Sequence, residues 1–141
     1  MKHNSMTIHN LISSKTDSAL LIIRSTVGLS FLIHGMLKVL HFQNATDFFG
    51  GLGLSSWWLL LVLSIEIVGG ILFLAGLFVE WVGIAFAIIM IVATMLASII
   101  HGISGGLEIN LILLFSAIAI SLSGPGVYTI GYFFGRKIVL E

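Results

Sequence analysis

Two side chains able to exchange protons interrupt an otherwise apolar stretch, SFLIHGMLKVLHF at residues 30–42. His34 and Lys38 are four positions apart, so a helix places them on one face. Both groups can donate hydrogen bonds, and an imidazole also exchanges protons near neutral pH. Glu66 brings a carboxylate into a second apolar stretch. These three groups predict acid–base or hydrogen-bonding chemistry in apolar surroundings.

Three more polar side chains lie at the ends of apolar stretches: His101, Glu108 and Asn110. Together with the first three they form the candidate polar pocket of this sequence. Arg24 precedes Lys38 by fourteen residues and falls within about 40° of the same helical face. Arg24 is therefore a secondary candidate, part of one polar stripe along a helix.

The composition indicates the class of protein. The chain has 141 residues, of which 58% are hydrophobic and 9% are charged. Soluble domains carry charge on about 25% of their positions, so this chain has too few charges to cover a globule in water. The length suits one domain, residues 1–141. We therefore predict a single integral membrane domain.

The charge balance and the cysteine count exclude several functions. Six Lys and Arg residues balance six Asp and Glu residues. This leaves no basic excess to bind phosphate backbones, so we expect no nucleic acid partner. The sequence has no cysteine, which excludes disulfides, thiolate catalysis, Cys-ligated zinc and iron–sulfur clusters. We predict no metal site, and any redox role requires a cofactor or partner from outside the chain.

Several segments have the apolar composition of a membrane-crossing helix, which needs about 20 residues. They are residues 18–40, 57–79, 81–100 and 107–123. They predict an all-α fold, a four-helix transmembrane bundle. The glycine-rich stretch at 41–56 is interpreted as a loop, and GPG at 124–126 ends the fourth helix because proline lacks an amide donor.

Positive residues predict the orientation of these helices. Lys2 and Lys15 precede the first span, and Arg136 and Lys137 follow the last, whereas the first and third loops contain no Lys or Arg. The positive-inside rule therefore places both termini in the cytoplasm. The candidate pocket then lies in the outer half of the membrane.

The cost of charge in lipid indicates how the polar residues are arranged. A charged side chain facing lipid costs about 2.5 to 3.5 kcal/mol on insertion scales, so we expect these residues to face one another inside the bundle. Lys38 and Arg24 carry positive charges, and Glu66 and Glu108 carry negative charges. The set therefore predicts a neutral network.

Each polar residue also has a purely structural interpretation. Lys38 and Arg24 can extend toward the headgroups, and Glu108 lies in the first turn of its helix, where the helix dipole favours an anion. His34 and Glu66 lie too deep in the membrane for their side chains to reach the headgroups. Their depth favours a functional pocket over a structural pair.

The polar residues and glycines also occur in an order that resembles a known family. The stretches that carry the resemblance are RSTVGLSFLIHGMLKV, FFGGLGL, EIVGGILFLAGLF, GGLEINLILL and GPGVY. With a His at the end of the third span, they are similar to the pattern of the DoxX family of small four-helix membrane proteins, over about residues 20–130. Relatives include a quinone-reducing subunit and members of membrane oxidoreductase complexes.

The resemblance implies a quinone-linked redox subunit in the cytoplasmic (inner) membrane of a prokaryote. The candidate pocket has suitable residue types, since a quinone headgroup needs a hydrogen-bond donor for each carbonyl oxygen and a nearby acid. Expected partners are the lipid bilayer and other redox proteins, and the sequence leaves open whether the chain forms a homo-oligomer.

Three other hypotheses are considered. His34 and His101 could ligate a haem, but their depths differ by about 9 Å along the helices, so we do not expect haem. A non-catalytic membrane scaffold that recruits redox enzymes is one alternative function. A small-solute or proton pathway is the other.

Overall fold

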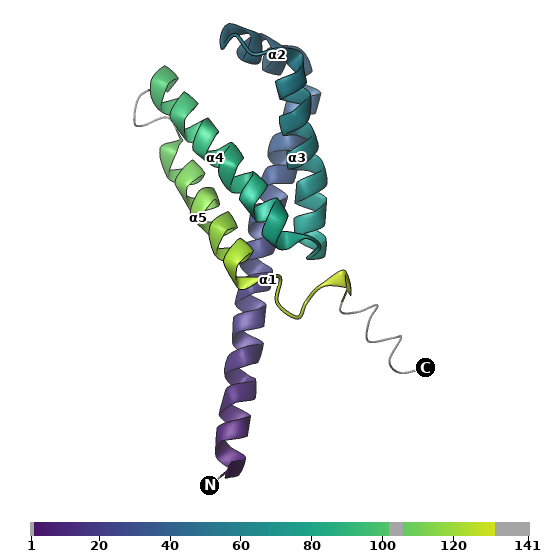
Figure 1. Ribbon diagram of the computed structural model, residues 1–141, viewed down its shortest axis with the longest axis vertical. Coiled ribbons are helices and arrows are strands. Elements are labelled where there is room, and N and C mark those ends of the chain that lie inside the picture. Colours follow the sequence, from purple (N-terminus) through teal and green to yellow (C-terminus); the bar gives the residue numbers. More distant parts are fainter. Residues whose placement is uncertain (1, 102–105, 132–141) are drawn as a thin grey trace.

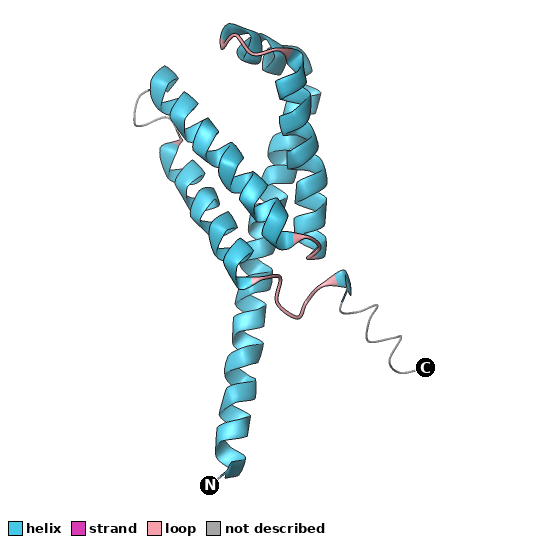
Figure 2. Ribbon diagram, in the orientation of Figure 1, coloured by secondary structure: helices cyan, strands magenta, loops and turns pink. Residues whose placement is uncertain are grey.

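The computed structural model describes residues 2–101 and 106–131, and the side chains of residues 15–96 and 106–131 (Figure 1). Five helices make up this part of the chain. They are α1 (Lys2–Leu40), α2 (Phe42–Gly51), α3 (Ser56–Ala75), α4 (Val79–His101) and α5 (Leu107–Ser123). The described residues contain no strand (Figure 2), which confirms the all-α prediction.

Within the described residues, three helices are long and apolar enough to cross a membrane, over Lys15–Leu40, Ser56–Ala75 and Val79–Leu96. The helix α5 is also apolar but has only 17 residues. The hydrocarbon core requires about 17 to 25 residues, so α5 meets the lower limit. Large apolar side chains such as Ile22 and Leu122 remain exposed on the outside of the bundle, as lipid-facing residues do. The protein is an integral membrane protein built as a helical bundle.

The helices α1 and α3 pack closely because glycines remove side chains from their contact. A Cβ added to Gly28 would lie 3.1 Å from the carbonyl oxygen of Gly70, and one added to Gly70 would lie 3.0 Å from that of Gly28. Farther along α1, a Cβ on Gly35 would lie 2.7 Å from Cγ1 of Ile67. Small residues permit this close approach between membrane helices.

The helices α4 and α5 form a second close pair. A Cβ added to Gly83 would lie 2.9 Å from the carbonyl oxygen of Ala117 and 2.8 Å from Cβ of Ser121. The Ser121 hydroxyl donates to the backbone carbonyl of Glu80 at 2.7 Å. The bundle therefore consists of two tightly packed helix pairs, α1–α3 and α4–α5.

Buried phenylalanines join the two pairs. Phe31 of α1 stacks on Phe86 of α4 with ring centroids 3.6 Å apart, and Phe73 of α3 lies 5.3 Å from Phe86. All three side chains are buried. From this junction the α1–α3 and α4–α5 pairs diverge toward the end of the bundle that carries α2 (Figure 1). The divergence opens the interior at that end.

The helices differ from the predicted spans 57–79 and 81–100 at their shared boundary. The helix α3 already ends at Ala75, because Gly76 adopts a left-handed conformation with φ of 74°. The amides that follow bond back to carbonyls of the last helical turn, which is a common way to end a helix at glycine. The next helix then begins at Val79.

The stretch at 41–56, predicted as a loop, contains the helix α2. Gly50 and Gly51 are the last two residues of the helix, so they do not interrupt it. A hydrogen bond of 3.0 Å between the side chains of Gln43 and Asp47, one helical turn apart, supports it. The helix lies across the end of the bundle (Figure 1). The first helix also differs from its prediction, since it begins at Lys2 and not near residue 18.

The chain leaves α5 at the predicted place. Ser123 is the last helical residue, and Gly124 has a φ of 78°. Residues 124–131 then lie at the end of the bundle remote from α2 (Figure 1). That this end faces the cytoplasm remains a prediction, and Arg136 and Lys137, on which it partly depends, lie outside the described residues.

Candidate functional site

The diverging end of the bundle contains a cavity of about 650 Å³. Four of the predicted pocket residues line it: His34, Lys38, Glu66 and Asn110. The other lining residues are all apolar or aromatic and come from α2, α3, α4, α5 and the loop after α2. The cavity is thus a largely apolar space with a few polar groups, the usual composition of a small-molecule site.

Lys38 and Glu66 form an ion pair in the wall of this cavity. Nζ of Lys38 lies 2.5 Å from Oε1 and 2.6 Å from Oε2 of Glu66. The Glu66 side chain is 2% exposed and that of Lys38 is 30% exposed. Each charge therefore has its counterion beside it, which offsets the cost of removing both from water. An ammonium carries three N–H donors, so Lys38 keeps one for another acceptor.

A glycine on α1 permits this ion pair. Gly35 lies three residues before Lys38, and a Cβ added to it would lie 3.1 Å from Cβ of Glu66. A residue with a side chain at this position would push α3 away from α1 at the level of the carboxylate. Because Gly35 has no side chain, α3 packs close enough to α1 for Glu66 to reach Lys38.

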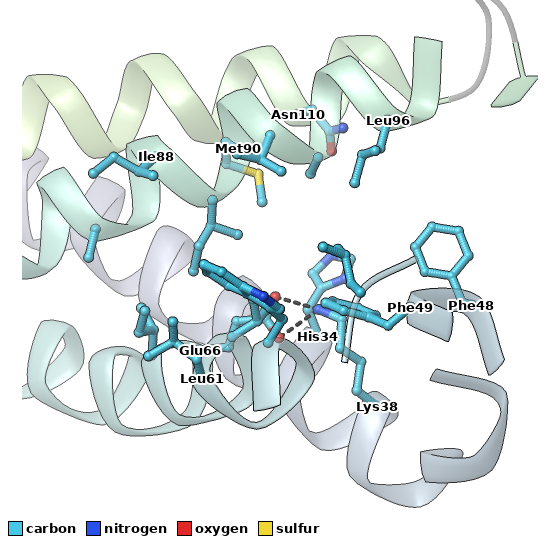
Figure 3. Close-up of a pocket in the computed structure, with 18 of the residues that line it drawn as sticks. His34, Lys38, Phe48, Phe49, Leu61, Glu66, Ile88, Met90, Leu96 and Asn110 are labelled. Atoms are coloured by element: carbon cyan, nitrogen blue, oxygen red, sulfur yellow. Dashed lines mark hydrogen bonds and ion pairs between the residues drawn. The ribbon is translucent and has the colours of Figure 1, made fainter. Parts of the chain in front are cut away.

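His34 lies beside the ion pair on the same side of the cavity. Figure 3 shows its ring next to the contact between Lys38 and Glu66. The residue is exposed, and within the described part of the chain its imidazole has no hydrogen-bond partner. The ring is therefore available to a ligand in the cavity, both as a donor and as an acceptor.

Asn110 extends the polar lining to the opposite wall. It belongs to the first turns of α5 and is half-buried. Figure 3 shows it across the cavity from Glu66 and Lys38, on the same side as Met90 and Leu96. Its amide has two N–H donors and one acceptor oxygen. Hydrogen-bonding groups therefore lie on two facing walls with apolar surface between them.

Aromatic lining residues are the part of the site that sequence reasoning missed. Trp58 lines the cavity from α3. Phe48 and Phe49 line it from α2 (Figure 3). Trp58 precedes Glu66 by eight residues, so helical spacing already places the two on one face. Helical spacing could not identify the two phenylalanines, because the stretch that forms α2 was predicted as a loop.

The structure does not bring all the predicted residues together. Glu108 is exposed and does not line the cavity. It lies two residues before Asn110, about 200° around the helix, so the two side chains point to different sides of α5. The predicted network of four charges therefore reduces to one ion pair among the described residues. The side chain of His101 lies outside the described part of the chain.

Arg24 lies apart from the cavity, which corrects the prediction of one continuous polar stripe. Fourteen residues of helix separate it from Lys38 by about 21 Å. Its guanidinium donates to the carbonyl oxygens of Pro125 and Tyr128, both at 2.6 Å. The residue is only 1% exposed. Arg24 therefore anchors the segment after α5 to the opposite end of the bundle.

Replacing Arg24 with lysine is expected to loosen residues 124–131. A guanidinium reaches two carbonyls at once, whereas an ammonium on a shorter stem does not reproduce this geometry. Loss of one charge-assisted hydrogen bond costs about 1.5 kcal/mol or more, which corresponds to a roughly tenfold rise in opening of the segment. Chymotrypsin cleavage after Tyr128 in detergent-solubilised protein measures this rise.

The exposed Lys15 on the same helix provides the control for this substitution. Lys15→Arg should leave the rate of cleavage after Tyr128 unchanged. Equal cleavage of Arg24→Lys and wild type would show that the two carbonyl contacts do not hold the segment.

Fold and site together define an integral membrane helical bundle with a self-neutralised ion pair in an apolar cavity. In a comparison with known protein families, residues 19–101 match the DoxX family. The chain is 32% identical over 104 residues to "Putative oxidoreductase CatD" of Bacillus subtilis (strain 168), covering 74% of this chain and 78% of that protein. The chain therefore belongs to the DoxX family, which confirms the resemblance seen in the sequence. No solved structure matches it.

Proposed function

We propose that this DoxX-family protein is the quinone-binding subunit of a membrane oxidoreductase. The observation that carries the proposal is the placement of His34 and Lys38 on one wall of an apolar cavity and Asn110 on the facing wall (Figure 3). A quinone headgroup is flat and has two carbonyl oxygens on opposite sides of the ring. Donors on two facing walls match this arrangement of acceptors, and the name of the relative in Bacillus subtilis supports a redox role.

The charge of the cavity favours an uncharged headgroup. The carboxylate of Glu66 already neutralises Lys38, so the pair adds no net charge to the lining. An anionic ligand would have to compete with the carboxylate for the ammonium, whereas a neutral carbonyl needs only the remaining N–H. The apolar and aromatic walls accommodate the ring faces.

Reduction of a quinone to a quinol consumes two electrons and two protons. The sequence has no cysteine and so cannot ligate an iron–sulfur cluster. In this proposal the two electrons come from a reduced flavin on a partner protein. His34 can donate one proton to a quinone oxygen and regain it from water, because an imidazole can both release and accept a proton. Water in the cavity supplies the second proton to the other oxygen. In this proposal the chain supplies the binding site and the proton donor, and the partner supplies the electrons.

Quinone binding to the purified protein tests the proposal. Asn110→Leu and His34→Leu should each weaken the binding of a soluble benzoquinone roughly tenfold, the loss expected for one hydrogen bond of about 1.4 kcal/mol. Asn44→Leu provides the matched control, because Asn44 is exposed on α2 and does not line the cavity. Tryptophan fluorescence is a suitable readout, since Trp58 lines the cavity.

Equal quinone affinity of Asn110→Leu, His34→Leu and wild type, at equal thermal stability, would contradict the proposal. Retention of a partner oxidoreductase in a pulldown by protein that binds no quinone would instead support the scaffold hypothesis.

A further inference from the structure

Several residues that line the cavity also lie on the outer surface of the bundle. Leu61 of α3 is 50% exposed, and Ile88 and Val92 of α4 are 57% and 49% exposed. Exposure alone is normal for residues that face lipid. These side chains differ because each borders the cavity as well, so the cavity reaches the surface between α3 and α4.

The helices α3 and α4 make a close contact near their connecting turn. A Cβ added to Gly69 of α3 would lie 2.9 Å from the ring of Phe86 on α4, and Phe73 packs against the same ring. Beyond this contact the helices diverge toward the α2 end (Figure 1). Leu61 and Ile88 therefore lie on the two edges of a slot, and the contact of Phe86 with α3 marks the end of the slot nearer to the connecting turn.

The slot has only apolar edges, whereas the polar groups lie deeper, at Lys38, Glu66 and Asn110. A water-soluble ligand has no favourable contact with such an opening inside a bilayer. A hydrocarbon chain does, because it contacts the edges on one side and lipid on the other. The cavity volume of about 650 Å³ suits a drug-sized headgroup and cannot also enclose a long chain.

We propose that the cavity opens sideways into the bilayer through the slot between Leu61 and Ile88. Its ligand is then an amphiphile with a compact, uncharged, carbonyl-bearing head and a long hydrocarbon tail. The head reaches the Lys38–Glu66 pair, and the tail passes through the slot into the lipid. This inference rests on the proposed function and adds the class of quinone, one with an isoprenoid tail, and its route of entry.

A tryptophan that narrows the slot tests this inference. Two probes carry the same benzoquinone head, one with a decaprenyl tail and one without a tail. Ile88→Trp should weaken binding of the tailed probe at least tenfold more than it weakens binding of the tailless probe. Leu61→Trp, on the other edge, should act in the same way.

Ile91→Trp is the matched control, since Ile91 lies on the same helix and is 44% exposed but does not line the cavity. It should leave the binding of both probes at the wild-type level. Thermal unfolding of all three variants identifies any that fails to fold, and either slot variant alone suffices for the comparison.

The outcomes separate this inference from the proposed function. If wild type binds neither probe, the proposed function fails. If wild type binds both probes and the slot variants bind the tailed probe equally well, the sideways entry is wrong while quinone binding stands. Equal loss of both probes in the slot variants would also overturn the inference. If a change of oligomeric state in detergent accompanied that loss, the slot would be assigned to contact with a second copy of the chain.

Discussion

Replacing Lys38 with methionine is expected to lower the free energy of unfolding by about 3 to 5 kcal/mol, the cost of leaving one partner of a buried ion pair alone. Both carboxylate oxygens of Glu66 contact the lysine, and the Glu66 side chain is only 2% exposed. Among the described residues no other cation is paired with Glu66, so the substitution leaves its carboxylate without a counterion. Methionine keeps most of the apolar stem of lysine, so the change isolates the charge. Equilibrium unfolding in mild detergent titrated with SDS measures the loss.

The double variant Lys38→Met with Glu66→Gln shows whether the loss comes from the unpaired charge. The free energy of unfolding of this double variant should lie within about 2 kcal/mol of the wild-type value, because the effects of substituting two residues in one ion pair are not additive. Lys15→Met is the control, since Lys15 is exposed on the same helix, and it should change stability by less than about 0.5 kcal/mol. Additive losses in the double variant would mean that the two side chains stabilise the bundle independently.

Replacing Gly70 with leucine is expected to lower the free energy of unfolding by about 3 kcal/mol, near the upper end of the usual range for overpacking. Even its Cβ would lie 3.0 Å from the carbonyl oxygen of Gly28 and 3.1 Å from the amide nitrogen of Leu32. Backbone atoms cannot move aside as the end of a flexible side chain can, so α1 and α3 must separate. Glu66 lies one helical turn before Gly70, so the separation should also weaken its pairing with Lys38. The same unfolding measurement applies.

Two comparisons make this second prediction specific. Gly50→Leu is the matched control, because a Cβ there would meet no atom within 4 Å, and it should be close to neutral. In the Gly70→Leu background, Lys38→Met should cost about 1 kcal/mol or less, since the ion pair is already weakened. An undiminished cost would show that the pair survives without close packing of α1 on α3.

Local patterns in the sequence predicted much of the fold. A chain with 58% hydrophobic and 9% charged residues has to be buried in lipid, and the backbone of an apolar segment in lipid must satisfy its own hydrogen bonds, which makes it helical. The predicted positions of the helix ends were less accurate. A single left-handed glycine, Gly76, ended α3 early, and the short helix α2 formed in a stretch whose glycines suggested a loop.

Within the candidate site, the sequence by itself determined that Glu66 needs a polar partner and that His34 and Lys38 share a helical face, because charge in lipid is costly and helical periodicity is regular. It did not determine the partner, since Lys38 and Arg24 both met the same requirement. Only the tertiary structure decided this, because an ion pair depends on distances of a few ångströms between helices. Close contact at Gly35 brings Lys38 to Glu66, whereas Arg24 binds the carbonyls of the segment after α5. The cavity and its slot likewise depend on the angle between two helix pairs, which side chains from different helices set together and no single helix encodes.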